Sequence, residues 1–96
     1  MRKLGLLFFR GGVFIEKIAV ISAILEDPIK SQEEFNDILI NFRGKIKGRM
    51  GIPIREDITV ISIILTGKLD EINSLTGKLG KIQGVSIKTA IGKKEI

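Results

Sequence analysis

The 96-residue sequence contains no cysteine, no histidine, no tryptophan and no tyrosine. Without cysteine there is neither a disulfide framework nor thiolate chemistry. Without cysteine or histidine, the usual ligands of structural zinc and of soft transition metals are missing, so we expect no metal and no cofactor. The apolar runs are strand-sized and fall well short of the roughly 20 residues that span a membrane. We therefore expect a cytoplasmic protein with no membrane partner.

The residues that are present favour one small folded domain. Hydrophobic residues make up 44% of the chain, which is typical of a globular protein rather than a disordered one. The formal net charge is +5, which favours an anionic partner without identifying one. Acid–base catalysis usually needs a tuned side chain in a cleft, and no nucleophile has an evident base nearby. We therefore expect no enzymatic activity.

Residues 1–14 do not match the pattern of the rest of the chain. Arg10-Gly11-Gly12 is a tripeptide that a purine-rich ribosome-binding site would encode if it were translated. One hypothesis is that this N-terminal extension is a mis-assigned start and that a single domain occupies residues 15–96. The alternative is that residues 1–14 form an extra strand or arm.

Two apolar, β-branched segments predict the central strands of one sheet. Residues 57–67 (DITVISIILTG) are almost continuously apolar, and residues 17–25 (KIAVISAIL) have the same character. Residues 45–52 predict a weaker edge strand that Pro53 closes, and residues 85–91 alternate as a half-buried last strand.

Two amphipathic segments predict helices. Ser31 and Glu34 form a capping-box signature at the start of the first helix, and Gly44 is expected to end it. Its apolar side chains recur at helical spacing: Phe35, Ile38, Leu39 and Phe42. The second helix is expected over residues 68–83, with Gly84 as its C-cap.

The resulting order, β-α-β-β-α-β, predicts an α+β ferredoxin-like sandwich in which both helices cover one face of an antiparallel sheet. Right-handed crossovers place the first and third strands at the centre. In such a sheet the central strands should alternate apolar and polar residues, yet both faces of these two strands are apolar. We therefore expect a homo-oligomer, a dimer or tetramer, that buries the open face. The alternative is that residues 1–14 cover it.

A small anionic ligand is the first binding hypothesis. Gly77 lies inside the second predicted helix, where glycine costs about 1 kcal/mol relative to alanine, and it faces away from the apolar stripe. A ligand or a neighbouring subunit that approaches the backbone would explain this glycine, and so would a broken helix. The candidate ligand-binding residues are Arg49, Arg55, Ser74, Gly77 and Lys78.

Nucleic-acid binding is the alternative hypothesis. Four basic residues alternate along the edge strand and are expected to share one face: Arg43, Lys45, Lys47 and Arg49. Such a row is also common as a solvated edge. Gly77–Gly80 matches the short GxxG of KH domains, but it lies within one helix rather than between two. A third hypothesis is an assembly partner that binds no ligand.

From residue 15 to about residue 94 the chain resembles the family described as regulators of the iron-only hydrogenase system. The matching segments are IEKIAVISAILED, GRMGIPIREDITVISIILTG and INSLTGKLGKIQGVSIKT. The resemblance implies a ferredoxin-like, ACT-like fold similar to the ligand-binding domain of the nickel-responsive repressor. It also implies an oligomeric sensing domain that takes part in transcriptional regulation.

Two features of that repressor do not carry over to this chain. Its nickel ligands are histidine and cysteine, and this chain has neither. We expect no counterpart of its DNA-binding ribbon-helix-helix segment, because only a short segment precedes the domain in this sequence. Direct DNA binding is therefore not supported by the sequence, and the regulatory role depends on the resemblance.

Overall fold

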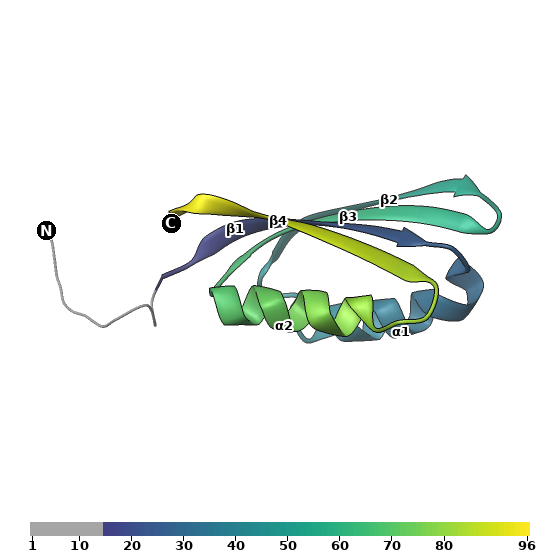
Figure 1. Cartoon of the computed structure of the whole chain (residues 1–96), viewed down its shortest axis with the longest axis horizontal. Coiled ribbons are helices and arrows are strands. Elements are labelled where there is room, and N and C mark those ends of the chain that lie inside the picture. Colours follow the sequence, from purple (N-terminus) through teal and green to yellow (C-terminus); the bar gives the residue numbers. More distant parts are fainter. Residues whose placement is uncertain (1–14) are drawn as a thin grey trace, which may run out of the picture.

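The computed structural model describes residues 15–96; residues 1–14, and with them the hypotheses on the N-terminal extension, lie outside the described part. The elements follow in the predicted order, and their bounds are β1 Lys17–Leu25, α1 Pro28–Ile40, β2 Ile46–Arg55, β3 Ile58–Gly67, α2 Leu69–Gly80 and β4 Val85–Glu95. Figure 1 shows both helices on the same side of a four-stranded sheet. The predicted ferredoxin-like sandwich is confirmed.

The sheet has the order β2-β3-β1-β4, and every neighbouring pair is antiparallel. The two most apolar strands, β1 and β3, are therefore central, as predicted, and β2 is an edge strand. Along the central pair, Val20 lies opposite Ile64 and Ser22 opposite Ser62. Because side chains alternate between the faces of a strand, this register puts Ala19, Ile21 and Ala23 on the helix side.

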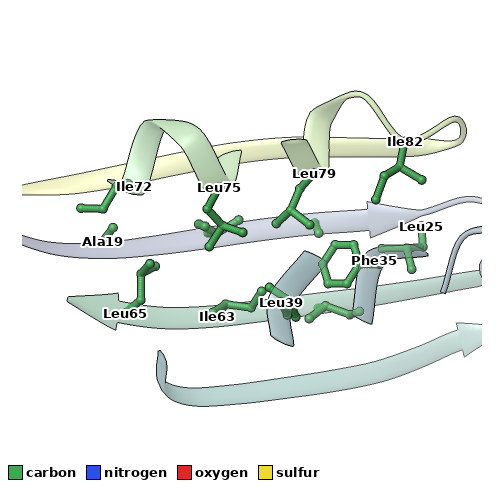
Figure 2. Packing of buried hydrophobic residues seen from close by; sticks show 13 residues of the cluster. Ala19, Leu25, Phe35, Leu39, Ile63, Leu65, Ile72, Leu75, Leu79 and Ile82 are labelled. Carbon is green, nitrogen blue, oxygen red and sulfur yellow. The ribbon is translucent and has the colours of Figure 1, made fainter. Parts of the chain in front are cut away.

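The core lies between the helices and the inner face of the sheet, as Figure 2 shows. Phe35 and Leu39 of α1 and Leu75 of α2 pack there with β3 residues such as Ile63. Phe35, Leu75 and Ile63 are fully buried, so their transfer from water contributes about 1.5–3 kcal/mol each to folding. The apolar stripes of both helices thus cover the inner sheet face, which leaves the opposite face without a layer.

The first helix begins earlier than its capping-box signature predicts. Asp27 is the N-cap residue and Pro28 occupies the first turn, where its fixed φ suits a helix and its missing N–H costs nothing. Ser31 is instead buried within the helix, and its hydroxyl donates a hydrogen bond to the Asp27 carbonyl at 3.0 Å. The prediction that Ser31 caps the helix was wrong, because Pro28 starts the helix about one turn earlier in the chain. At the other end the helix stops at Ile40.

The second half of the chain also differs at its boundaries. β2 continues through Pro53 to Arg55, which an edge strand permits because one side of its backbone needs no partner. α2 ends at Gly80 rather than at residue 83. Gly84 lies in the turn that follows, with a φ of 81° that a residue without a Cβ adopts readily.

The outer face of the sheet is apolar over β1, β2 and β3. The pairing places Val20 beside Ile64 and Ile24 beside Val60, and Val60 in turn lies beside Ile52 of β2. Exposed fractions are 36% for Val20 and 46% for Ile64. Polar residues lie on the same face where β4 meets β1, since Lys88 pairs with Ser22. We call this surface the open sheet face and define it by Ile18, Val20, Ile24, Met50, Ile52, Val60 and Ile64.

Candidate functional site

The predicted ligand residues Ser74, Gly77 and Lys78 lie on α2, at the i, i+3 and i+4 spacing that places them on one helical face. All three are exposed. The Lys78 ammonium lies 5.6 Å from the centroid of the Phe42 ring, a cation–π distance that connects α2 to the turn after α1. α2 is regular through Gly80, so Gly77 does not mark a break in the helix.

Replacing Gly77 with alanine is expected to stabilise the fold. A Cβ built at Gly77 has no atom within 4 Å, so the substitution should gain the helix propensity difference of about 1 kcal/mol in the free energy of unfolding. Urea denaturation measures this gain. The matched control is Gly84→Ala, which also meets no neighbour but should destabilise because its φ is positive. A neutral or destabilising Gly77→Ala would contradict the expectation.

Lys45, one of the four basic residues of the edge-strand hypothesis, is held by carboxylates. Its ammonium lies 3.4 Å from Glu71 and 3.9 Å from Glu16. Glu71 also accepts a hydrogen bond at 2.8 Å from the backbone N–H of Lys68, which caps the start of α2. This backbone hydrogen bond, with help from Lys45, holds the pKa of Glu71 below its ordinary value. Lys45 therefore supports the α2 N-terminus.

Glu71→Ala is expected to lower the free energy of unfolding by about 1 kcal/mol at neutral pH, the usual cost of a lost cap. Because the folded-state pKa is lowered, the stabilisation is complete above the unfolded-state pKa and disappears as the pH falls through the folded-state value. The difference from the parent should therefore vanish in strong acid. Denaturant titrations at neutral pH and in strong acid measure this difference in the free energy of unfolding. The control is Glu33→Ala, at an exposed position. A stability difference that persists unchanged in acid would contradict the conclusion that ionised Glu71 caps the start of α2.

The other basic residues of the edge strand are not in one row. The pairing of β2 with β3 shifts between Ile46 and Gly48, so the strict alternation on which the predicted row rested stops at Lys47. Arg49 pairs with Ile63, which points to the helices, and its guanidinium donates to the Asn36 side-chain oxygen of α1 at 2.6 Å. Arg55 lies at the end of β2, where its guanidinium makes two 3.1 Å hydrogen bonds to Asp57.

The structure thus separates the candidate ligand residues into three places. Ser74, Gly77 and Lys78 share the exposed face of α2, Arg49 lies between β2 and α1, and Arg55 belongs to the β2–β3 turn. Arg43, from the nucleic-acid set, lines the same groove as Arg49. These two arginines line one groove with polar Asn36 and three apolar residues that the site hypotheses did not include: Leu39, Ile40 and Ile46. The sequence signal that could have pointed to this groove was Ile40, an isoleucine that lies outside the apolar stripe of α1 and is exposed.

A second hollow, of about 440 Å³, lies between the β1–α1 turn and the α2–β4 turn. The Glu26 N–H donates to the Gly84 carbonyl at 2.8 Å and connects the two turns. Three carboxylates line the hollow, from Glu26, Asp27 and Glu34, together with Lys30. An anion is disfavoured there. Within residues 15–96, no three acidic side chains gather in a way that would hold a metal ion.

The chain over residues 17–89 matches the TM1266-like family model, described as "Iron-only hydrogenase system regulator, putative". This chain belongs to the TM1266-like family. The matched range runs from the start of β1 into β4 and thus includes both helices and the whole central pair of strands. The resemblance found in the sequence is confirmed. The family is described as one of regulators, and no curated protein sequence matches the chain.

Solved structures agree with this family and fold. The uncharacterized protein TM1266 from Thermotoga maritima is similar with 35% sequence identity and a TM-score of 0.77, over 81% of this chain and 99% of that one. The ACT domain from GTP pyrophosphokinase of Chlorobium tepidum is similar with 20% identity and a TM-score of 0.62, over 82% of this chain and 89% of that one. The second likeness shows the fold alone, and it confirms an ACT-like arrangement.

A third similar structure is the C-terminal domain of the MgtC protein from Mycobacterium tuberculosis, with 12% identity and a TM-score of 0.63. It covers 83% of this chain and 92% of that chain, and it too shows only the shared fold. Neither helix in the described part of this chain has the length and apolar character needed to cross a membrane.

Proposed function

We propose that this TM1266-like protein is a homo-oligomeric regulatory module, in which an ACT-like domain senses a small ligand and takes part in transcriptional regulation associated with iron-only hydrogenase. Its family and its ACT-like fold support the regulatory role. The observation that carries the oligomer is the open sheet face, because α1 and α2 both cover the opposite side. The proposed partner is a second copy of this chain.

The chemistry of the open sheet face supports association. Ile18, Ile24 and Ile64 are each between 43% and 46% exposed, although they lie on the two central strands of the sheet. Met50 and Ile52 extend the surface onto β2 and are 59% and 46% exposed. Contiguous aliphatic surface of this kind is uncommon on monomers and typical of interfaces. A two-fold axis lets one such surface cover its own copy, and two of these dimers would give a tetramer.

The solution mass of the full chain, measured by light scattering, tests this proposal. We expect a dimer or a tetramer of the 10.6 kDa chain. The same measurement on residues 15–96 separates two causes of burial. An oligomer in both proteins supports association through the sheet. A full-length monomer that associates only after the first 14 residues are removed would show that those residues cover the face, and the proposal would then fail.

A further inference from the structure

A groove separates α1 from the edge strand β2, on the helix side of the sheet and away from the open sheet face. Its volume is about 330 Å³, within the usual range for small-molecule sites. Leu39 is only 4% exposed and Ile46 packs against the core, while Ile40 is 54% exposed. The lining residues are Asn36, Leu39, Ile40, Arg43, Ile46 and Arg49. Apolar side chains therefore supply contact area, and two arginines supply all of the lining charge.

Positive charge in this groove is not neutralised by the described protein. The ion pairs of residues 15–96 involve Lys30, Lys45 and Arg55, and neither Arg43 nor Arg49 takes part in one. Asp37 follows Asn36 on α1 but does not line the groove. Two guanidinium groups that share a groove without a carboxylate partner favour an anion from solution.

Arg49 is held in place before any ligand binds. Its guanidinium donates to the Asn36 side-chain oxygen at 2.6 Å and lies 6.0 Å from the centroid of the Phe35 ring. Phe35 is fully buried, so it provides a fixed surface for this contact. A guanidinium group carries five N–H donors, and Asn36 accepts from one of them. The remaining donors keep the planar geometry that pairs with both oxygens of a carboxylate.

We propose that this groove binds a small amphipathic carboxylate, with its charged end at Arg43 and Arg49 and its apolar body against Leu39, Ile40 and Ile46. This inference deepens the proposed sensing function and rests on it. It revises the ligand site, since Arg43 joins Arg49, while Arg55 is engaged by Asp57 in another part of the sheet. The groove requires no residue of a second copy.

Nucleic acid fits the groove less well than a small ligand. A phosphate backbone is bound by an extended series of cations. Here Lys45 is held by Glu16 and Glu71, and the shift at Lys47 interrupts the row. The apolar floor beneath the two arginines also has no counterpart in a phosphate-binding surface.

The test is an NMR titration of the full chain with phenylacetate, which joins a carboxylate to an apolar ring. The neutral analogue phenylacetamide is the ligand control. We expect saturable shifts of the backbone signals of Asn36 and Ile40 and of the guanidinium signals of Arg43 and Arg49. A ligand of about ten non-hydrogen atoms should bind with a dissociation constant of about 1 mM. Phenylacetamide should bind about 10- to 100-fold more weakly, because it cannot form the charge-assisted hydrogen bonds.

Matched variants separate the groove from general charge effects. Arg49→Gln and Arg43→Gln should each weaken phenylacetate binding about 10-fold or more. Arg55→Gln removes the same charge from β2, the strand that also carries Arg49, and should leave binding unchanged. Equal loss in all three variants, equal binding of phenylacetamide, or shifts confined to the open sheet face would overturn the proposal. Preferential binding of a single-stranded oligonucleotide that falls steeply with salt would replace it with nucleic-acid binding.

Light scattering on the same samples distinguishes this inference from the proposed function. If the parent protein is an oligomer but phenylacetate does not bind to it, the groove assignment fails and the assembly stands. If phenylacetate binds in the groove of a monomer, the groove assignment stands and the oligomeric part of the proposed function fails.

Discussion

Ile64→Glu should convert the oligomer into a folded monomer. Ile64 lies on the central strand β3, directly opposite Val20, and its side chain points away from both helices. In the proposed interface a glutamate here would be buried without a partner, at a cost of about 3–5 kcal/mol. This cost corresponds to at least a 100-fold weaker association, and a symmetric interface contains the change in both copies. Light scattering over a range of protein concentrations measures the effect.

Ile29→Glu is the matched control for this experiment. Ile29 lies on α1 and is 89% exposed, so the same chemical change occurs away from the open sheet face. This variant should retain the mass of the parent protein. Circular dichroism of the Ile64→Glu protein should show an intact fold, because Ile64 is 46% exposed in the single chain. A parental mass for Ile64→Glu would place the interface elsewhere.

Leu75→Ala should cause a large loss of stability. Leu75 is fully buried where α2 meets the sheet, among the side chains that Figure 2 shows. Removal of a buried leucine side chain costs about 2–5 kcal/mol, because the transfer energy is lost and a cavity remains. Domains of this size have a total stability of about 5–15 kcal/mol, so a large share of it would disappear. Urea denaturation measures the change.

Leu69→Ala provides the same chemical change in the first turn of the same helix. Leu69 is 49% exposed, so its loss should alter the free energy of unfolding by only about 0.5 kcal/mol. Both variants and the parent should be compared at one protein concentration, because association contributes to apparent stability. Similar losses in the two variants would show that Leu75 is not part of a tightly packed core.

The central strands were predictable because the apolar pattern within each segment indicates a place at the centre of the sheet. Two apolar faces in residues 17–25 and 57–67 distinguish β1 and β3 from the edge strands, and the βαββαβ order then determines which strands are neighbours. The helix boundaries were less predictable, because two start signals lie close together. Pro28 prevailed over the Ser31 capping box, and Ser31 turned inward to the Asp27 carbonyl.

The arrangement of the basic residues could not be predicted from spacing alone. A period of two assigned Lys45, Lys47 and Arg49 to one face, but one irregular residue in a strand is enough to end such a pattern. Their partners are also distant in the chain, as with Glu71 for Lys45 and Asn36 for Arg49. No periodicity within β2 contains that information.

By itself, the sequence determined the order of the elements, the two central strands, the two apolar helix stripes and the second apolar sheet face. Each of these follows from the spacing of apolar residues within one segment, and spacing is a local property. Only the tertiary structure decided which charges are paired and which remain available. Arg55 meets Asp57, Lys45 meets Glu16 and Glu71, and Arg43 and Arg49 share an apolar groove. Charge pairing depends on distances of a few ångströms between separate elements, and those distances exist only once the helices pack on the sheet.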